Sequence, residues 1–225
     1  MSAVALTDDQ LNQALSIRDL TDPAAGEHAI QLVLDALESA VGTAAGAPVR
    51  RNYGSRVVTV ADNYDRLRFD ADAVTRDRRY SRYLADGRML RSHTTARIPG
   101  LLAEHATAGR HEVLHSAPGL CYRRDVIDRH HVGEPHQLDL WRVRSSGTPL
   151  TEPDLVEMIS AVVSTVLPGR AWYTVPNPHP YTLAGREIYV RDGAEDVEIG
   201  ECGLAHPEVL SGAGLPTSAS GLAMG

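Results

Sequence analysis

The sequence predicts an α+β fold in which helices flank a mainly antiparallel sheet. Residues 27–41 and 151–167 carry apolar side chains at a spacing of three and four, which is typical of amphipathic helices. Short stretches rich in β-branched residues follow one another through brief turns, and this favours antiparallel pairing. No internal repeat or linker divides the chain, so we expect residues 1–225 to form one domain, with residues 1–25 as a helix and lead-in.

Three stretches carry the signals of helices. In residues 6–15, Thr7 stands three positions before Gln10, the capping-box spacing that satisfies backbone N–H groups at a helix start. Thr151 and Asp154 form a cap at the start of residues 151–167. One face of each longer helix is apolar, and its members are Ile30, Val33, Leu34, Leu37 and Val41 in the first helix and Leu155, Met158, Ile159, Val162, Val163 and Val166 in the second.

The first strands are predicted from β-branched and alternating residues. Residues 56–69 indicate a strand followed by a turn at Asn63, and residues 87–109 a strand followed by a helix from about Thr95 to Thr107. Residues 111–128 indicate two strands broken at Pro118 and Gly119. The remaining predicted strands are residues 136–145, 171–175, 187–192 and 197–204, while the small-residue tail 211–225 is interpreted as flexible or as the start of another element.

Composition excludes several classes of protein. The net charge of −7 argues against a surface that coats nucleic acid generally, although a local basic patch stays possible. No run approaches about 18 apolar residues, and residues 1–15 lack a basic region followed by an apolar stretch. Cys121 and Cys202 have neither disulfide-framework nor zinc spacing, so we interpret them as buried, inert thiols. We therefore expect a cytoplasmic protein with no membrane association.

Charge is concentrated between two predicted strands. Residues 122–143 hold four Arg, three Asp, one Glu and three His. Arg123 at the end of a strand and a histidine in the following loop make a suitable grip for a polyphosphate, because a guanidinium neutralises charge that grows on phosphate during displacement. Gln137 and Asp139 share one strand face because side chains alternate, and that face could hold a substrate ammonium.

This segment resembles motif 2 of class II aminoacyl-tRNA synthetases, in the version of the phenylalanyl-tRNA synthetase alpha subunit. The family pattern is tyrosine, arginine, any residue, acid, a loop with histidine, then phenylalanine, histidine, glutamine, any residue, glutamate. Without a gap, this sequence reads Tyr122, Arg123, Arg124, Asp125, His131, Pro135, His136, Gln137, Leu138 and Asp139.

Three other stretches fit the same family in the same order. Residues 90–102 resemble its R-T-H-T-S segment, and residues 63–67 resemble N-F-D-x-L. Residues 201–210, followed by 220–225, resemble G-C-G-M-V-H-P-x-V-L and then G-F-A-F-G. Residues 27–37 would be the motif 1 helix, which lies at the dimer interface in this class. The resemblance covers residues 26–225 and implies the class II fold.

The resemblance also implies roles for individual residues. Arg123 would bind the ATP α-phosphate and stabilise the pentacoordinate transition state, while His131 would contact the outer phosphates and Asp125 the adenine side. Mg²⁺ would accompany ATP, and no metal ligand is assigned on the protein. The implied amino-acid-binding residues are His93, Thr95, Gln137 and Asp139, with His179 and Tyr181 around the substrate side chain and Gly203 and Ala223 on the pocket floor.

Several residues depart from the family pattern. Pro135 replaces the phenylalanine that stacks on adenine, so stacking at this ATP-binding position is weaker or differently supplied. His179 and Tyr181 replace two pocket phenylalanines, which predicts a substrate with a hydrogen-bonding side chain, or one smaller than phenylalanine. Motif 3 should continue past Gly225 with an arginine for the γ-phosphate, so either the chain is part of a longer product or motif 3 is lost, and we expect a missing tail.

Each assignment has a plainer alternative. Arg123 could form a surface ion pair, His131 could be solvated, and His93 could be a satisfied core histidine. Gln137 and Asp139 could form a polar sheet face, and the other pocket residues could simply pack.

Three functions remain open. The first is activation of an amino acid as its adenylate, with transfer to a carrier protein, a small molecule or a protein side chain. The second is a tRNA ligase, with or without a partner subunit, and the third is a non-catalytic regulatory paralogue.

Overall fold

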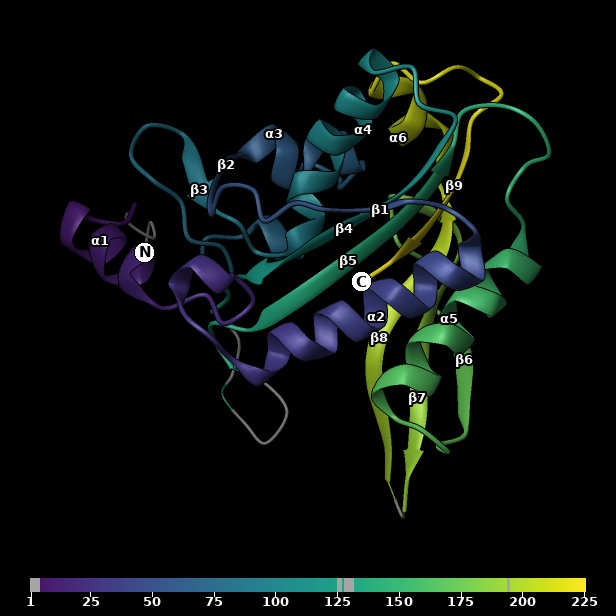
Figure 1. Ribbon diagram of the computed structural model, residues 1–225. Coiled ribbons are helices and arrows are strands. Elements are labelled where there is room, and N and C mark those ends of the chain that lie inside the picture. The colour runs from purple at the N-terminus through teal and green to yellow at the C-terminus, as the bar shows by residue number, and fades with distance from the viewer. Residues whose placement is uncertain (1–4, 125–126, 128–131, 194) are drawn as a thin grey trace.

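The computed structural model describes residues 5–124, 127, 132–193 and 195–225. A seven-stranded sheet with the order β1-β4-β5-β9-β8-β7-β6 forms the centre, and β2 and β3 form a separate pair (Figure 1). Only β1 and β4 pair in parallel among the described strands, which confirms a mainly antiparallel sheet. The strands are β1 (Val49–Arg51), β2 (Val57–Thr59), β3 (Arg88–Leu90), β4 (Glu112–Leu120), β5 (His136–Arg144), β6 (Trp172–Pro176), β7 (Thr182–Asp192), β8 (Glu195–Ala205) and β9 (Ser220–Met224).

Two helices begin at the capping residues that the sequence predicts. Thr7 with Gln10, and Thr151 with Asp154, form complete capping boxes at the starts of the first and fifth helices. The helices are α1 (Asp8–Ser16), α2 (Ala29–Ala45), α3 (Val60–Asn63), α4 (Ile98–Thr107), α5 (Glu152–Val166) and α6 (Pro207–Gly212), and short 3₁₀ turns cover Pro23–Ala25, Asp65–Leu67, Val74–Arg76 and Thr94–Arg97. Within the described residues, none of the helices combines the length and the apolar character that a membrane crossing requires.

One face of the sheet packs against α2 and α5. Figure 1 shows these two helices lying across the strands. Alternate side chains of each strand point toward them, because successive residues of a strand face opposite sides. The buried members of this layer include Val41, Leu114, Leu140, Leu155, Met158, Ile159, Val163, Ile188, Cys202, Leu222 and Met224.

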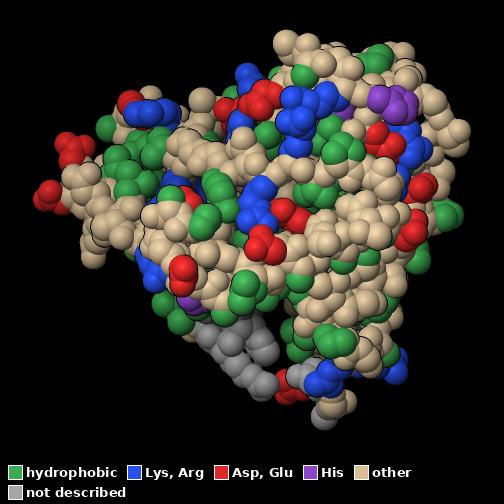
Figure 2. Space-filling model, viewed as in Figure 1, with side chains coloured by type: hydrophobic (Ala, Val, Ile, Leu, Met, Phe, Trp, Pro, Cys, Tyr) green, Lys and Arg blue, Asp and Glu red, His purple; other side chains and the backbone are tan. Residues whose placement is uncertain are grey.

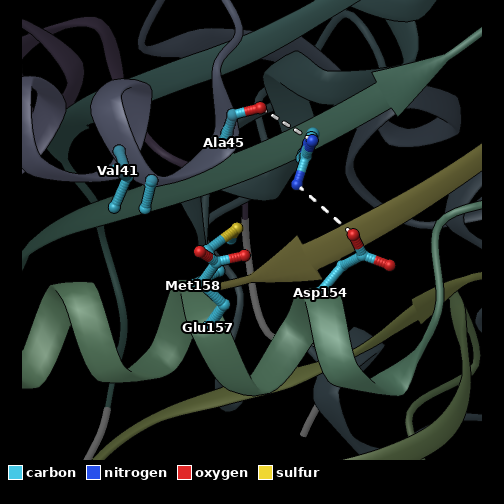
Figure 3. A pocket seen from close by; sticks show the side chains of 7 residues that line it. Val41, Ala45, Asp154, Glu157 and Met158 are labelled. Carbon is cyan, nitrogen blue, oxygen red and sulfur yellow. Dashed lines mark hydrogen bonds and ion pairs between the residues drawn. The ribbon is translucent and has the colours of Figure 1, made fainter.

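A shallow pocket between α2 and α5 belongs to this structural layer (Figure 3). It is lined by Val41, Ala44, Ala45, Arg142, Asp154, Glu157 and Met158. Arg142 donates from Nη2 to the Ala45 carbonyl at 2.8 Å, and its Nη1 lies 3.8 Å from Asp154 Oδ1. The guanidinium thus connects the end of α2 with the start of α5. None of the predicted substrate-binding residues lines this pocket.

The opposite face of the sheet packs against α4 and α6. Ile98, Leu101 and Leu102 of α4, and Val209 and Leu210 of α6, contact a second buried cluster that includes Ala117, Trp141, Val143, Ala205 and Ala223 from the strands. The predicted substrate residues of β5, β8 and β9 share this face. The fold therefore separates a structural face, covered by α2 and α5, from a face that carries the polar side chains.

The strand break predicted at Pro118 and Gly119 is wrong. β4 runs continuously through both residues and pairs with β5 along its whole length. Proline is tolerated there because β1 ends opposite Ser116, which leaves β4 as an edge strand on that side. Gly119 has φ of 153°, and a Cβ at this position would lie 1.9 Å from Nη2 of buried Arg91. The glycine therefore serves close packing rather than a turn.

Three other element predictions are also revised. The helix expected from about Thr95 begins at Ile98, after a 3₁₀ turn at Thr94–Arg97, and the turn expected at Asn63 is the last residue of α3. The tail 211–225, interpreted as flexible or as the start of another element, contains the last two residues of α6 and then β9, which lies between β5 and β8. Its small residues suit this crowded place, because a Cβ at Gly221 would come within 2.9 Å of the Ala205 Cβ.

Candidate active site

The floor of the candidate site is made of small residues on the face opposite α2. Ala223 of β9 pairs with Trp141 of β5 on one side and with Gly203 of β8 on the other. A Cβ at Gly203 would lie 2.7 Å from the Thr182 Cβ, so a larger residue does not fit. The structure thus places both predicted floor residues side by side on adjacent strands, beneath the polar groups described next.

Asp139 lies at the centre of the site and is 3% exposed. Its Oδ2 accepts hydrogen bonds from Thr94 Oγ1 at 2.6 Å and from Thr95 Oγ1 at 3.1 Å, and its Oδ1 lies 3.4 Å from the Trp141 indole nitrogen. Burial raises the pKa of the carboxyl to about 6, against the opposing effect of these hydrogen bonds. A desolvated carboxylate held by neutral donors binds a cation strongly, which suits a substrate ammonium.

Unsatisfied polar atoms gather among the predicted amino-acid-binding residues. Among the described residues, four buried side-chain N or O atoms have no hydrogen-bond partner, and three of them are His93 Nδ1, Gln137 Oε1 and His179 Nε2. The fourth is His115 Nδ1. Buried polar atoms are normally paired, so such a group indicates a place that a ligand completes. Gln137 lies two residues before Asp139 on β5 and shares its face, as predicted.

His93 is buried in an aromatic setting. Its ring stacks on Phe69 with centroids 5.8 Å apart, and its Nε2 lies 3.4 Å from Asn63 Nδ2. Burial, together with the nearby Arg123 guanidinium, lowers the pKa of His93 to about 3. The imidazole is therefore neutral near pH 7, with one nitrogen to offer a ligand.

Arg123 is anchored where the charged loop begins. Its Nε donates to the Ser92 carbonyl at 2.9 Å, and its backbone N–H donates to the Gly133 carbonyl at 2.7 Å. Its charge contributes to the low pKa of His93 and opposes the rise in the pKa of Tyr181 that burial causes. A half-buried cation thus lies beside the segment that carries His93, which is one of the predicted amino-acid-binding residues.

Two predicted ATP contacts lie in the charged loop. Asp125 and His131 fall outside the described residues. Pro135, at the end of this loop, accepts a hydrogen bond from the Cys121 backbone N–H through its carbonyl at 2.8 Å. Among the residues that the structure describes, no group of three or more His, Cys, Asp or Glu side chains could hold a metal ion.

His179 and Tyr181 lie together beside a third residue, Glu201. The two rings stack with centroids 5.9 Å apart. Tyr181 donates from its hydroxyl to Glu201 Oε2 at 3.2 Å, and His179 Nδ1 lies 3.3 Å from the same oxygen. Burial and the Glu201 charge raise the pKa of Tyr181 well above 10. The Tyr181 ring also faces Phe69 and Trp141, at centroid distances of 6.1 Å each.

Sequence reasoning missed four residues of this arrangement. Asn63 and Ser92 form two mutual hydrogen bonds, at 2.8 and 3.1 Å, and so fix the backbone that carries His93 and holds Arg123. Phe69 and Glu201 contact the rings of the predicted side-chain pocket. Glu201 was visible in the sequence, because it stands at the first glycine of the G-C-G pattern. Asn63 and Ser92 lie in the two stretches that resemble N-F-D-x-L and R-T-H-T-S, whereas Phe69 has no comparable signal.

The family match and the similar proteins agree with one another. Residues 14–225 match the tRNA synthetases class II core domain (F) family. The chain is 30% identical over 173 residues to the phenylalanine–tRNA ligase alpha subunit of Acaryochloris marina, covering 76% of this chain and 50% of that protein. For the same subunit of Prochlorococcus marinus the identity is 28% over 229 residues, covering 100% of this chain and 65% of that protein. The chain therefore spans about half to two thirds of these relatives.

The fold has a counterpart among solved structures. A pyrrolysyl tRNA synthetase from Desulfitobacterium hafniense superimposes with a TM-score of 0.63 over 96% of this chain and 70% of that one. The sequence identity of 16% makes this a similarity of fold alone. It supports the class II architecture that the sequence predicts.

Proposed function

The chain belongs to the family of class II tRNA synthetase core domains, and we propose that it uses ATP to activate an amino acid as the aminoacyl-adenylate. One observation carries this proposal: residues 92–95 contact both a cation and a buried carboxylate, because Ser92 accepts from Arg123 while Thr94 and Thr95 donate to Asp139, and three unsatisfied buried polar atoms belong to the predicted amino-acid-binding residues. This arrangement suits a molecule with an ammonium group that reacts beside a phosphate.

The roles follow from the chemistry of the groups. Asp139 and Gln137 accept hydrogen bonds from the α-ammonium, which orients the carboxylate of the amino acid. One carboxylate oxygen attacks the α-phosphorus of ATP, and the bond from that phosphorus to the pyrophosphate oxygen breaks. Arg123 neutralises the charge that grows on the α-phosphate oxygens. Mg²⁺ would travel with the triphosphate and supply further neutralisation, and Pro135 would lie on the nucleotide side without a ring for stacking.

The test uses neighbouring arginines as a matched pair. The protein is incubated with ATP, Mg²⁺ and a mixture of amino acids, and bound aminoacyl-adenylate is measured by mass spectrometry. Arg123→Ala should abolish the product while circular dichroism stays unchanged. Arg124→Ala, which removes an exposed side chain, should retain it. Normal product from Arg123→Ala would remove the assignment of this arginine to the phosphate.

For the second step we propose transfer to an acceptor other than tRNA, such as a carrier protein or a small molecule. The net charge of −7 supports this choice. On the face shown in Figure 2, acidic and basic side chains are interspersed. A nucleic-acid surface is ordinarily marked by a gathering of basic side chains.

Transfer to tRNA is the second candidate, and the names of the relatives favour it. Labelled amino acid is supplied with total tRNA or with an RNA-free cell extract, and the labelled product is identified. Label on tRNA that ribonuclease removes would establish the second candidate and exclude the first.

We also propose that α2 forms a homodimer interface. Leu32 is 72% exposed on this helix, and it lines an apolar groove with Val33, Ala36, Thr165 and Val166. Burial of such a surface stabilises association. Leu32→Glu should convert a dimer into a monomer in light scattering, whereas Val74→Glu, at an apolar residue with 68% exposure elsewhere, should not. A monomeric unmodified protein would contradict the proposal.

A further inference from the structure

Two carboxylates face the same side of the sheet with a glycine between them. Asp139 belongs to β5 and Glu201 to β8, and Gly225 follows β9, which lies between these strands. Glu201 and Gly225 exchange backbone hydrogen bonds of 2.8 and 2.9 Å, and a Cβ on Gly225 would lie 3.4 Å from Asp139 Oδ1. The backbones of the two acids are therefore two strand spacings apart, about 10 Å. The second carboxylate lies beyond the one that suits the α-ammonium.

The hydrogen bonds around Glu201 determine what its surroundings can still bind. Tyr181 donates to Oε2, and His179 Nδ1 lies 3.3 Å from the same atom. A carboxylate only accepts, so a neutral His179 that turns its Nδ1–H toward Glu201 has an Nε2 that accepts. That Nε2 is buried without a partner, and the His179 side chain is 9% exposed. Among the described residues both contacts use Oε2, so Oε1 keeps its capacity to accept.

The far end of the pocket thus offers acceptors and a negative charge. A ligand group placed there must donate hydrogen bonds to be satisfied, and a positive charge on it would be further stabilised. The rings of Phe69, Trp141 and Tyr181 pack together beside this end, since the centroid of the Tyr181 ring lies 6.1 Å from each of the other two. Aromatic rings suit an aliphatic stem and also attract a cation.

We propose that the substrate amino acid carries a positively charged amine or guanidine group on its side chain, and that Glu201 selects it. This inference rests on the proposed function, because it assigns the α-ammonium to Asp139. An apolar side chain in the same place would leave buried His179 Nε2 without a partner, and would leave the Glu201 carboxylate, which keeps its hydrogen bond from Tyr181, without a counter-charge. Sites built to hydrogen-bond a substrate group reject the analogue that lacks it, because their buried polar atoms are then unpaired.

The first test compares neutral and cationic amino acids of matched shape. Binding of lysine against norleucine, and of arginine and ornithine against citrulline and norvaline, is measured by isothermal titration calorimetry with and without ATP. At least one cationic member should bind about tenfold or more tightly than its neutral counterpart, the scale of a charge-assisted hydrogen bond. Equal or tighter binding of the neutral members throughout, or no binding by any cationic member, would overturn the proposal.

Variants then assign the selectivity to one side chain. Glu201→Gln should reduce the preference to less than about threefold, because the charge is lost while shape and one acceptor remain. Glu198→Gln, at an exposed carboxylate of the same strand, should keep the full preference. A full preference in Glu201→Gln would contradict the role of this residue. If that variant does not fold, the comparison in the unmodified protein still decides the substrate class.

Activity measurements distinguish this inference from the proposed function. Adenylate formation is measured with the same amino acids and the same preparations. Selective binding of a cationic amino acid without adenylate formation would overturn the activation chemistry and keep the selectivity. Adenylate formation with phenylalanine, at a rate that Glu201→Gln does not change, would overturn the selectivity and keep the activation chemistry.

Discussion

Replacement of Asp139 tests the electrostatics of the site through protein stability. Burial raises the pKa of its carboxyl from the ordinary value of 3.8 to about 6. At about 1.4 kcal/mol per pH unit, ionised Asp139 costs the folded chain about 3 kcal/mol relative to the unfolded chain. Asp139→Asn removes the charge and keeps an oxygen that accepts from Thr94 and Thr95. We expect the variant to be more stable than the unmodified protein by up to about 3 kcal/mol at pH 8.

The sign of the pH dependence follows from proton binding. The folded chain holds the Asp139 proton more tightly than the unfolded chain, so the stability of the unmodified protein falls from pH 3.8 to about 6 on account of this group. The difference in unfolding free energy between Asp139→Asn and the unmodified protein should therefore be absent below pH 3.8, grow up to about pH 6 and stay constant above it. Urea denaturation followed by circular dichroism, at pH values of about 4, 5, 6 and 8, measures this difference.

A second acid supplies a control of opposite sign. The hydrogen bond from Thr151 lowers the pKa of Asp154 in the capping box of α5. Its ionised form stabilises the fold above the ordinary pKa of 3.8, so Asp154→Asn should destabilise the protein at pH 8. Two results would contradict this prediction. Asp139→Asn could be no more stable than the unmodified protein at pH 8, or its gain in stability could stay the same at every pH.

Three further outcomes are expected. The affinity for the amino acid should fall as pH is lowered through about 6, because protonated Asp139 no longer attracts an ammonium, and calorimetry at constant ionic strength measures this; a flat profile would contradict it. Gly119→Ala should destabilise the fold by about 3 kcal/mol or more, because its Cβ would overlap Arg91, and an unchanged urea midpoint would show that this strand adjusts freely. His179→Phe combined with Tyr181→Phe should shift amino-acid preference toward phenylalanine in adenylate formation, and an unchanged preference would show that these rings do not line the pocket.

Local signals in the sequence predict much of the fold. The capping boxes at Thr7 and Thr151 depend on residues three apart, and the apolar stripes depend on helical spacing, so both are visible without tertiary contacts. The strand through Pro118 is not predictable in this way, because proline is acceptable there only where β1 has ended. β9 was missed for a related reason, since its small residues are required by neighbouring strands and helices that are distant in sequence.

Only part of the candidate site could likewise be predicted from the sequence. Alternation within one strand is enough to place Gln137 and Asp139 on the same face. Glu201 could be associated with His179 and Tyr181 only after folding, because β8 and the loop after β6 are joined through a long hairpin with irregular register. Interactions within one element were therefore predicted, whereas those that join elements required the structure.

The central claim is activation of an amino acid, and amino-acid-dependent exchange of pyrophosphate into ATP tests it most directly. The protein is assayed with Mg²⁺, ATP and each amino acid of a panel that includes the cationic ones, with Arg123→Ala as the inactive control. The account predicts exchange with one amino acid or a small related group, and none with Arg123→Ala. A folded protein that binds an amino acid and supports no exchange with any of them would contradict the claim and indicate a non-catalytic member of the family.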